Sequence, residues 1–194
     1  DVLVDITGHT SLNRMHRWQQ RLARVMITGL AYPPTTGLSS IDYKLVDVHM
    51  LSDDSHRYYA EKQLVMPESF WCFDPMEDAY YNKEPPYKSS EFLTFACMGN
   101  SAKISEPMMR AWAQILRVRF NVRLLIVSPS FADHMTVRNF TEHMNSAGID
   151  LSRLTCRTTF DRNELWQRYA EIDLILDTFP FNGGTTSCWA TYAG

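Results

Sequence analysis

Hydrophobic and polar positions in the second half of the chain follow the alternation that parallel α/β proteins require. Short apolar runs of strand length alternate with longer segments in which apolar residues recur near helical spacing. The pattern predicts strands at Phe92–Met98, Arg123–Val127, Leu154–Thr158 and Asp173–Asp177, with helices at Glu106–Phe120, Ala132–Ala147 and Arg162–Glu171. Repeated strands and helices of these lengths predict a doubly wound parallel sheet.

The first half is less regular but carries strand and helix signals too. They predict strands at Val2–Ile6, Val25–Leu30, Lys44–Leu51 and Gln63–Met66, and helical stretches near Asn13–Leu22 and His56–Glu61. Residues 68–90 hold three prolines and little periodicity, so we expect a linker there between two regions at 1–67 and 91–194. Because the chain opens on a strand and stops at Gly194, we expect a fragment.

The segment from Asp177 to Thr186 is the strongest candidate for a ligand site. The apolar run Leu174–Leu176 predicts a buried parallel strand, and Asn182, Gly183 and Gly184 predict a turn that backbone can bring close to a ligand. Thr185, Thr186 or Ser187 is expected to cap the following helix, whose free amides attract anions. An ordinary strand-turn-helix corner is the alternative when this string is considered alone.

A second candidate loop follows the strand that ends at Met98. In an open parallel sheet, ligands bind beyond the carboxyl ends of the strands, so the loops after Met98, Val127, Thr158 and Asp177 should share one crevice. Lys103 would then bring a positive charge to an anion held by the Gly183–Thr186 turn. A solvated surface lysine is the alternative for Lys103.

Composition and charge limit the binding partners that the chain is expected to have. The chain has 194 residues, is 45% hydrophobic and carries a formal net charge of -3, with a pI near 6.1. These values show no excess of basic residues that could bind nucleic acid. No apolar run has the length that would span a membrane. Neither nucleic acid nor a membrane is therefore an expected partner. The four cysteines are far apart, which favours reduced thiols in the cytoplasm over a disulfide framework or a zinc site.

Acidic side chains in the first half suggest a metal site at first inspection. They are Asp5, Asp42, Asp47, Asp53 and Asp54, and they lie on separate predicted elements and surface loops. Solvated carboxylates explain such a scattered set better than a metal centre. We therefore expect no metal and no cofactor.

Four strings resemble the catalytic region of the O-linked N-acetylglucosamine transferase family, and most closely its SPINDLY-type branch. They are Asp5–Thr10, Tyr32–Leu38 with Asp42-Tyr43, Asn100–Ile104 and Leu176–Thr186. The resemblance is collinear over nearly the whole chain, which makes it far more specific than any single motif. It implies a glycosyltransferase fold of the B type, with a nucleotide-sugar donor bound between two lobes and inversion at the sugar without a metal ion. The chain would hold the end of the first lobe and most of a Rossmann-like second lobe.

The resemblance also implies roles for particular residues. Lys103 is similar to the lysine that contacts the donor diphosphate, and Asn100 occupies the neighbouring donor-contact position. The diphosphate loop is expected at Asn182, Gly183, Gly184, Thr185 and Thr186. The loop that reads the nucleobase is expected at Thr158, Thr159, Phe160 and Arg162. The donor substrate would be UDP-N-acetylglucosamine, and the acceptors would be serine and threonine hydroxyls of proteins.

The resemblance does not fix the general base or the donor sugar. His9 is a candidate general base because imidazole titrates near neutral pH, although a histidine after a strand is more often structural. The family's proposed bases lie at Asp1 or before residue 1, and a fragment lacking the base would be inactive. Trp189 replaces an acidic residue that can bind the ribose, and Pro34 replaces a glycine. These two departures, with the missing base, make a degenerate, non-catalytic binding module one alternative. The SPINDLY-like strings make a fucosyltransferase using GDP-fucose another.

Overall fold

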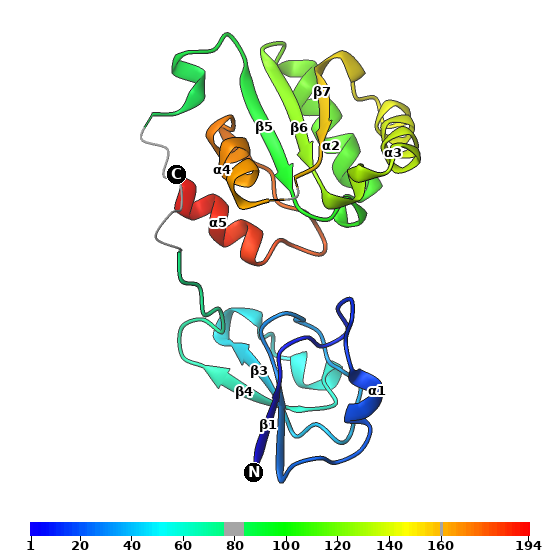
Figure 1. Cartoon of the computed structure of the whole chain (residues 1–194), viewed down its shortest axis with the longest axis vertical. Helices are drawn as coiled ribbons and strands as arrows, with labels where there is room; N and C mark the ends of the chain where they lie inside the picture. Colours follow the sequence, from blue (N-terminus) through cyan, green and yellow to red (C-terminus); the bar gives the residue numbers. More distant parts are fainter. Residues whose placement is uncertain (76–83, 160) are drawn as a thin grey trace. The chain divides into compact units, whose positions relative to one another are not determined.

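The computed structural model describes residues 1–75, 84–159 and 161–194 and divides the chain into two compact units (Figure 1). The first unit comprises Asp1–Asp74 and the second Pro75–Gly194. Each contains its own four-stranded parallel sheet. Of the segment 68–90, which the sequence predicts as a linker, residues 76–83 lie outside the described residues.

The sheet of the first unit follows the order of the chain. It runs β1-β2-β3-β4, formed by Val2–Asp5, Val25–Thr28, Tyr43–Asp47 and Lys62–Met66. All three pairs of neighbours are parallel, as in Val4 opposite Ile27 and Val46 opposite Val65. The four predicted strands are confirmed, with ends that differ by at most four residues.

The helices of the first unit are shorter than the sequence predicts. The helix expected over Asn13–Leu22 is the single turn α1, Met15–Trp18, and the stretch His56–Glu61 is replaced by a 3-10 turn at Ser55–Tyr58. The strand predicted to continue to Leu51 ends at Asp47, where a 3-10 turn forms over Val48–Met50. It ends there because the Asp47 carboxylate accepts hydrogen bonds from the next amides of that turn, at 3.0 and 3.1 Å.

A buried polar network lies inside the first unit. Lys44 is only 1% exposed and donates its Nζ proton to the carbonyl oxygen of Tyr32. Burial lowers the pKa of Lys44, although Glu61 and Asp5 oppose that shift by attraction. Glu61 accepts from the backbone and hydroxyl of Thr36, so the network fixes the loop that carries the Tyr32–Leu38 string.

Gly8 is expected to tolerate no side chain. Its φ is +52°, and an added Cβ would overlap Cβ of Tyr32 and lie 2.9 Å from its Cγ. Gly37 is a matched control, since its φ is +72° but an added Cβ meets nothing within 4 Å. Both Gly8→Ala and Gly37→Ala incur backbone strain of about 1–2 kcal/mol, and only Gly8→Ala adds overpacking of about 1–3 kcal/mol. Urea unfolding of the two variants measures the difference, and equal losses of stability would contradict the predicted overlap.

The second unit has the regular alternation that the sequence predicts. Its strands are β5, Leu93–Met98; β6, Val122–Val127; β7, Leu154–Arg157; and β8, Leu174–Ile175. Its helices are α2, Glu106–Val118; α3, His134–Ser146; α4, Arg162–Ala170; and α5, Thr185–Ala193. Short 3-10 turns lie at Pro86–Lys88, Ser101–Lys103, Pro129–Ala132 and Leu151–Arg153.

Two apolar cores cover the two faces of this sheet, with α2 and α3 on one side and α4 and α5 on the other (Figure 1). The stripe of α2 that includes Met108, Trp112 and Leu116 is buried in the first core, as its spacing predicts. Burial raises the pKa of the Cys97 thiol in this core to about 12. These two layers confirm the predicted doubly wound architecture.

The strand order of the second unit creates a crossover point. The sheet runs β7-β6-β5-β8, and every pair is parallel. The first three strands extend the sheet in one direction, whereas β8 returns to the opposite side of β5. In sheets of this kind, ligands bind beyond the carboxyl ends of the two strands at which the order reverses. That place lies between the loops that follow β5 and β8.

Candidate functional site

The loops after β5 and β8 meet at this crossover point. Lys103 belongs to the loop after β5, and its Nζ donates a hydrogen bond of 3.1 Å to the carbonyl oxygen of Asn182. The same ammonium lies 4.4 Å from the centre of the Phe181 ring, a cation-π contact. The structure therefore brings Lys103 onto the Asn182–Thr186 turn, as the sequence predicts.

Two glycines lie close to α5 and the turn before it. An added Cβ on Gly99, directly after β5, would lie 3.7 Å from Cγ2 of Thr186, so this strand end adjoins the first turn of α5. An added Cβ on Gly183 would overlap Oγ of Ser187 and lie 3.0 Å from Oδ1 of Asp177. A larger residue at position 183 would therefore displace the Ser187 hydroxyl that donates to Asp177.

Asp177 organises the turn from within, a role that the sequence reasoning missed. One carboxylate oxygen, Oδ1, accepts from the amides of Thr178 and Gly183, both at 2.7 Å. The other, Oδ2, accepts from the Ser187 hydroxyl at 3.3 Å. From the sequence, Asp177 was predicted only to end a strand. An acidic residue that precedes a Gly-rich turn and a helix was the signal that pointed to it.

The start of α5 differs from the prediction. The N-cap residue is Gly184, with φ −117° and ψ −104°, and no side chain among the described residues caps the helix. The predicted cap by Thr185, Thr186 or Ser187 is therefore wrong: the two threonines lie inside the helix, and Ser187 donates to Asp177. Since the amides of a helical first turn need partners, an uncapped start is open to an anion.

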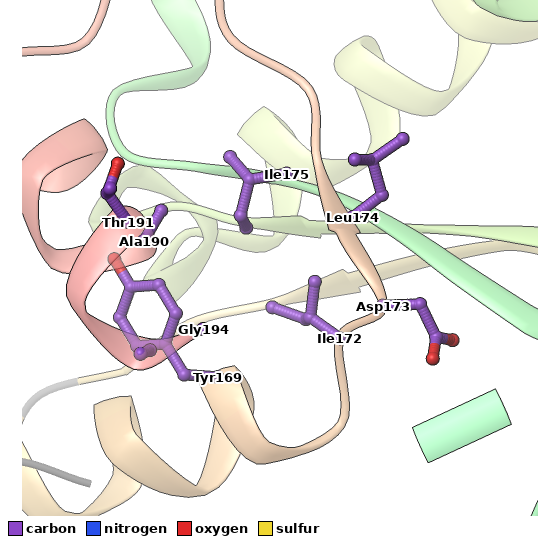
Figure 2. A pocket seen from close by; sticks show the side chains of 9 residues that line it. Tyr169, Ile172, Asp173, Leu174, Ile175, Ala190, Thr191 and Gly194 are labelled. Carbon is purple, nitrogen blue, oxygen red and sulfur yellow. The ribbon is translucent and has the colours of Figure 1, made fainter. Parts of the chain in front are cut away.

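Tyr169 fixes α5 against α4. Its hydroxyl donates a hydrogen bond of 3.2 Å to the carbonyl oxygen of Thr186, and Figure 2 shows the ring reaching from α4 to α5. Burial raises the pKa of Tyr169 to about 12, so the phenol stays a neutral donor at physiological pH. The ring also lines a cavity of about 240 Å³ between α4, β8 and α5, which contains none of the predicted site residues.

Tyr169→Phe is expected to lower the free energy of unfolding by about 1 kcal/mol, because it removes one hydrogen bond and leaves the Thr186 carbonyl without it. Chemical denaturation measures this change. Tyr58→Phe is the matched control, since the Tyr58 side chain is 72% exposed and its loss should cost nothing measurable. Equal stability of Tyr169→Phe and the unaltered chain would show that the bond does not hold the two helices together.

The other candidates of the second unit are placed as follows. Asn100 caps the 3-10 turn Ser101–Lys103 with its side-chain oxygen, which accepts from the amide of Ala102 at 3.0 Å. Ser101 contacts the loop after β6 through hydrogen bonds to Ser128 and Ser130, at 3.1 and 2.8 Å. The loops that follow β5, β6 and β8 are therefore joined.

The predicted nucleobase loop is described in part. Thr158 and Thr159 follow β7, and Thr158 Oγ1 is buried without a hydrogen-bond partner in the part of the chain that the structure describes. Phe160 lies outside the described residues, and Arg162 is the first residue of α4. The role of this loop stays a prediction.

His9 belongs to the first unit, where its ring is held by the neighbouring loop. Its Nε2 lies 2.8 Å from the carbonyl oxygen of Thr36, and because a carbonyl can only accept, Nε2 carries the proton. The ring also makes an edge-to-face contact with Tyr32. This arrangement is a structural one, and a catalytic role of His9 stays a prediction.

Of the five acidic candidates of the first unit, Asp53 and Asp54 are exposed, as expected, whereas others are engaged in the fold. Asp5 and Asp47 are 3% and 4% exposed, so their interpretation as solvated carboxylates is wrong. Asp5 accepts from the amide of Gly8 at 2.8 Å and the hydroxyl of Thr28 at 2.9 Å. Hydrogen bonds of this kind outweigh the effect of burial and lower the pKa of Asp5. Over residues 1–75, 84–159 and 161–194, no group of three or more His, Cys, Asp and Glu side chains is arranged to hold a metal ion.

No helix within these described ranges combines the length and the apolar character that a membrane crossing requires.

Comparison with known proteins places the chain beside one group of enzymes. It is 34% identical over 195 residues to a protein of Hordeum vulgare and 33% identical over 196 residues to one of Arabidopsis thaliana. Both are named probable UDP-N-acetylglucosamine–peptide N-acetylglucosaminyltransferase SPINDLY. The matches cover all of this chain, which spans about a fifth (21%) of the length of each relative. No family model matches the chain.

A solved structure agrees with the sequence comparison. The O-GlcNAc transferase of Thermobaculum terrenum, in a mutant form, superposes on 98% of this chain with a TM-score of 0.88 at 28% sequence identity. The match covers 36% of that protein. The arrangement of parallel sheets described above is therefore that of an O-GlcNAc transferase.

Proposed function

Because the chain belongs to the O-linked N-acetylglucosamine transferase family, in its SPINDLY-type branch, we propose that it forms part of a protein O-glycosyltransferase. In this proposal the donor is UDP-N-acetylglucosamine and the acceptors are serine and threonine hydroxyls of proteins. The reaction inverts the configuration at the sugar and needs no metal ion. Widely spaced cysteines support a cytoplasmic compartment.

The observation that carries the proposal is the contact between Lys103 and the Asn182–Thr186 turn. Two loops far apart in the sequence meet there, at 3.1 Å between Lys103 Nζ and the Asn182 carbonyl oxygen. They do so at the crossover point between β5 and β8, where open parallel sheets bind ligands. An exposed ammonium next to an uncapped helix start is suited to a diphosphate.

The chemistry of transfer suits these groups. When the bond between sugar and nucleoside diphosphate breaks, the leaving diphosphate gains negative charge. Lys103 and the first amides of α5 would stabilise that charge more strongly in the transition state than in the bound donor. Positive charge from the chain would thus take the place of a divalent cation. The general base is not assigned. His9 donates from Nε2 to the Thr36 carbonyl oxygen, which leaves Nδ1 as its acceptor nitrogen.

A degenerate, non-catalytic module is the second candidate, and Trp189 favours it. In the family an acidic residue at this position can bind the ribose of the nucleotide. Here the Trp189 ring packs edge-to-face on Trp166, with centroids 4.9 Å apart, and belongs to the core between α4 and α5. A side chain used for packing offers the ribose no carboxylate. Donor binding would then be weaker, changed or lost.

Calorimetry with UDP, GDP and ADP distinguishes these functions. We expect UDP to bind, whereas preferential binding of GDP would favour a fucosyltransferase that uses GDP-fucose. ADP serves as the control for non-specific binding of a diphosphate. If none of the three binds and unfolding curves show a folded chain, the degenerate module is favoured and the transferase proposal fails. Assay of the complete protein with a peptide acceptor then tests transfer itself.

A further inference from the structure

A second cavity, of about 300 Å³, lies on the α4 side of the sheet and is lined by an unusual number of arginines. Its polar lining consists of Thr94, Arg123, Thr155, Arg157, Arg168 and Glu171. We call it the arginine cavity. Its lining shares no residue with the Lys103 site or with the cavity of Figure 2.

The strand register explains why these side chains gather. Arg123 lies on the same face of β6 as Leu125 and Val127, which contact α4 and α5. Leu125 pairs with Thr155 and Val127 pairs with Arg157, so both β7 residues project from that face. Helix α4 adds Arg168, and Glu171 follows directly after the helix.

The charges in the arginine cavity are only partly balanced. Arg168 forms an ion pair of 2.8 Å with Glu171, and Arg123 donates to the Thr94 hydroxyl at 2.7 Å. Arg157 is exposed, and its side chain has no hydrogen-bond or ion-pair partner among the described residues. Arg168 Nε is buried without a partner in the same part of the chain. Three arginines and one glutamate leave a formal excess of two positive charges in a single concave site, within a chain whose net charge is -3.

We propose that the arginine cavity binds a phosphate-like dianion, either free inorganic phosphate or the phosphoryl group of a small phosphomonoester. Two negative charges match the excess of the lining. The guanidinium fork presents parallel N–H groups to two oxygens of one anion, and the hydroxyl of Thr155 can donate to a third. About 300 Å³ is the volume that roughly ten water molecules occupy in the liquid, so the cavity also has room for an organic group on the phosphate.

The lining of this cavity shares no residue with the Lys103 turn. Arg157 is the last residue of β7 and directly precedes the predicted nucleobase loop. Thr94 and Arg123 lie near the amino ends of β5 and β6, whereas Lys103 follows the carboxyl end of β5. An anion in the arginine cavity is therefore a different ligand from a diphosphate on the Lys103 turn.

Arg157→Ala is the cleanest test, because Arg157 has no partner in the described chain and its loss should not disturb the fold. Calorimetry uses inorganic phosphate and, in a second arm, glucose 6-phosphate. Loss of a hydrogen bond to a charged group predicts affinity reduced by about 10- to 150-fold. Arg138→Ala is the matched control, since exposed Arg138 on α3 pairs with Glu142 outside the cavity and should bind normally. Tighter binding of the ester identifies a phosphomonoester site, and equal or tighter binding of phosphate identifies a free-ion site.

Lys103→Ala separates this proposal from the proposed function. It should leave phosphate binding unchanged even if it abolishes binding of UDP. If the folded, unaltered chain binds neither probe, or if Lys103→Ala removes binding while Arg157→Ala retains it, the arginine cavity is not an anion site. Thermal unfolding of each variant establishes that a loss of binding is not a loss of fold.

Discussion

Lys103→Ala is expected to weaken binding of UDP by about 10- to 150-fold, the range that follows from losing a hydrogen bond to a charged group. The ammonium has three N–H donors and uses one on the Asn182 carbonyl oxygen, at 3.1 Å. The other two have no hydrogen-bond acceptor among the described residues and can reach a diphosphate without breaking that bond. In the complete enzyme, the same substitution should abolish transfer, because Lys103 is proposed to stabilise the leaving diphosphate.

Lys88→Ala is the control for this substitution. Lys88 belongs to the same unit, is exposed, and forms an ion pair with Glu84 instead of contacting the turn. Its removal changes the net charge equally, so a general electrostatic effect would weaken UDP binding in both variants. Unchanged affinity in Lys103→Ala would contradict the proposed site, and an equal loss in Lys88→Ala would show that net charge, not position, matters.

The fold of the second unit could be predicted because burial dictates its pattern. Leu124–Val127 is buried on both faces of the sheet and appears in the sequence as a continuous apolar run. The apolar residues of α2 pack on one face of the sheet and recur at helical spacing. The first unit was predicted less well for the same reason. Its interior contains polar side chains such as Lys44 and Glu61. Their hydrogen-bond partners are distant in the sequence, so no recurring pattern of residues predicts them.

Some contacts of the candidate site could also be predicted from the sequence, and others could not. The approach of Lys103 to the Asn182–Thr186 turn was predictable, because parallel strands bring their following loops to one edge. The role of Tyr169 was not predictable, because an aromatic residue on a helix usually indicates packing in the core. The sequence does not show that the Tyr169 hydroxyl donates to the Thr186 carbonyl oxygen of another helix. The helix cap was mispredicted because hydroxyl residues at a helix start suggest capping, whereas here Asp177 takes the Ser187 hydroxyl.

Asp177→Ala is expected to be the most damaging single change in the turn. It removes the acceptor of the Thr178 and Gly183 amides, and each of these two hydrogen bonds contributes about 0.5–1.5 kcal/mol. The free energy of unfolding should fall by a similar amount, measured by chemical denaturation. Binding of UDP should be lost as well, because the turn that holds Asn182 and the start of α5 would no longer be fixed.

Asp177→Asn separates the geometry of this side chain from its charge. Both backbone amides bond to the same oxygen, Oδ1, which the asparagine carbonyl replaces, and the new amide group can donate to the Ser187 hydroxyl oxygen. The turn should therefore persist, while a negative charge next to the diphosphate disappears. Relief of about 0.2–1 kcal/mol of repulsion at an exposed position predicts UDP binding that is equal or up to about fivefold tighter. If Asp177→Asn instead loses binding as completely as Asp177→Ala, the carboxylate acts through its charge and not as the scaffold of an anion turn.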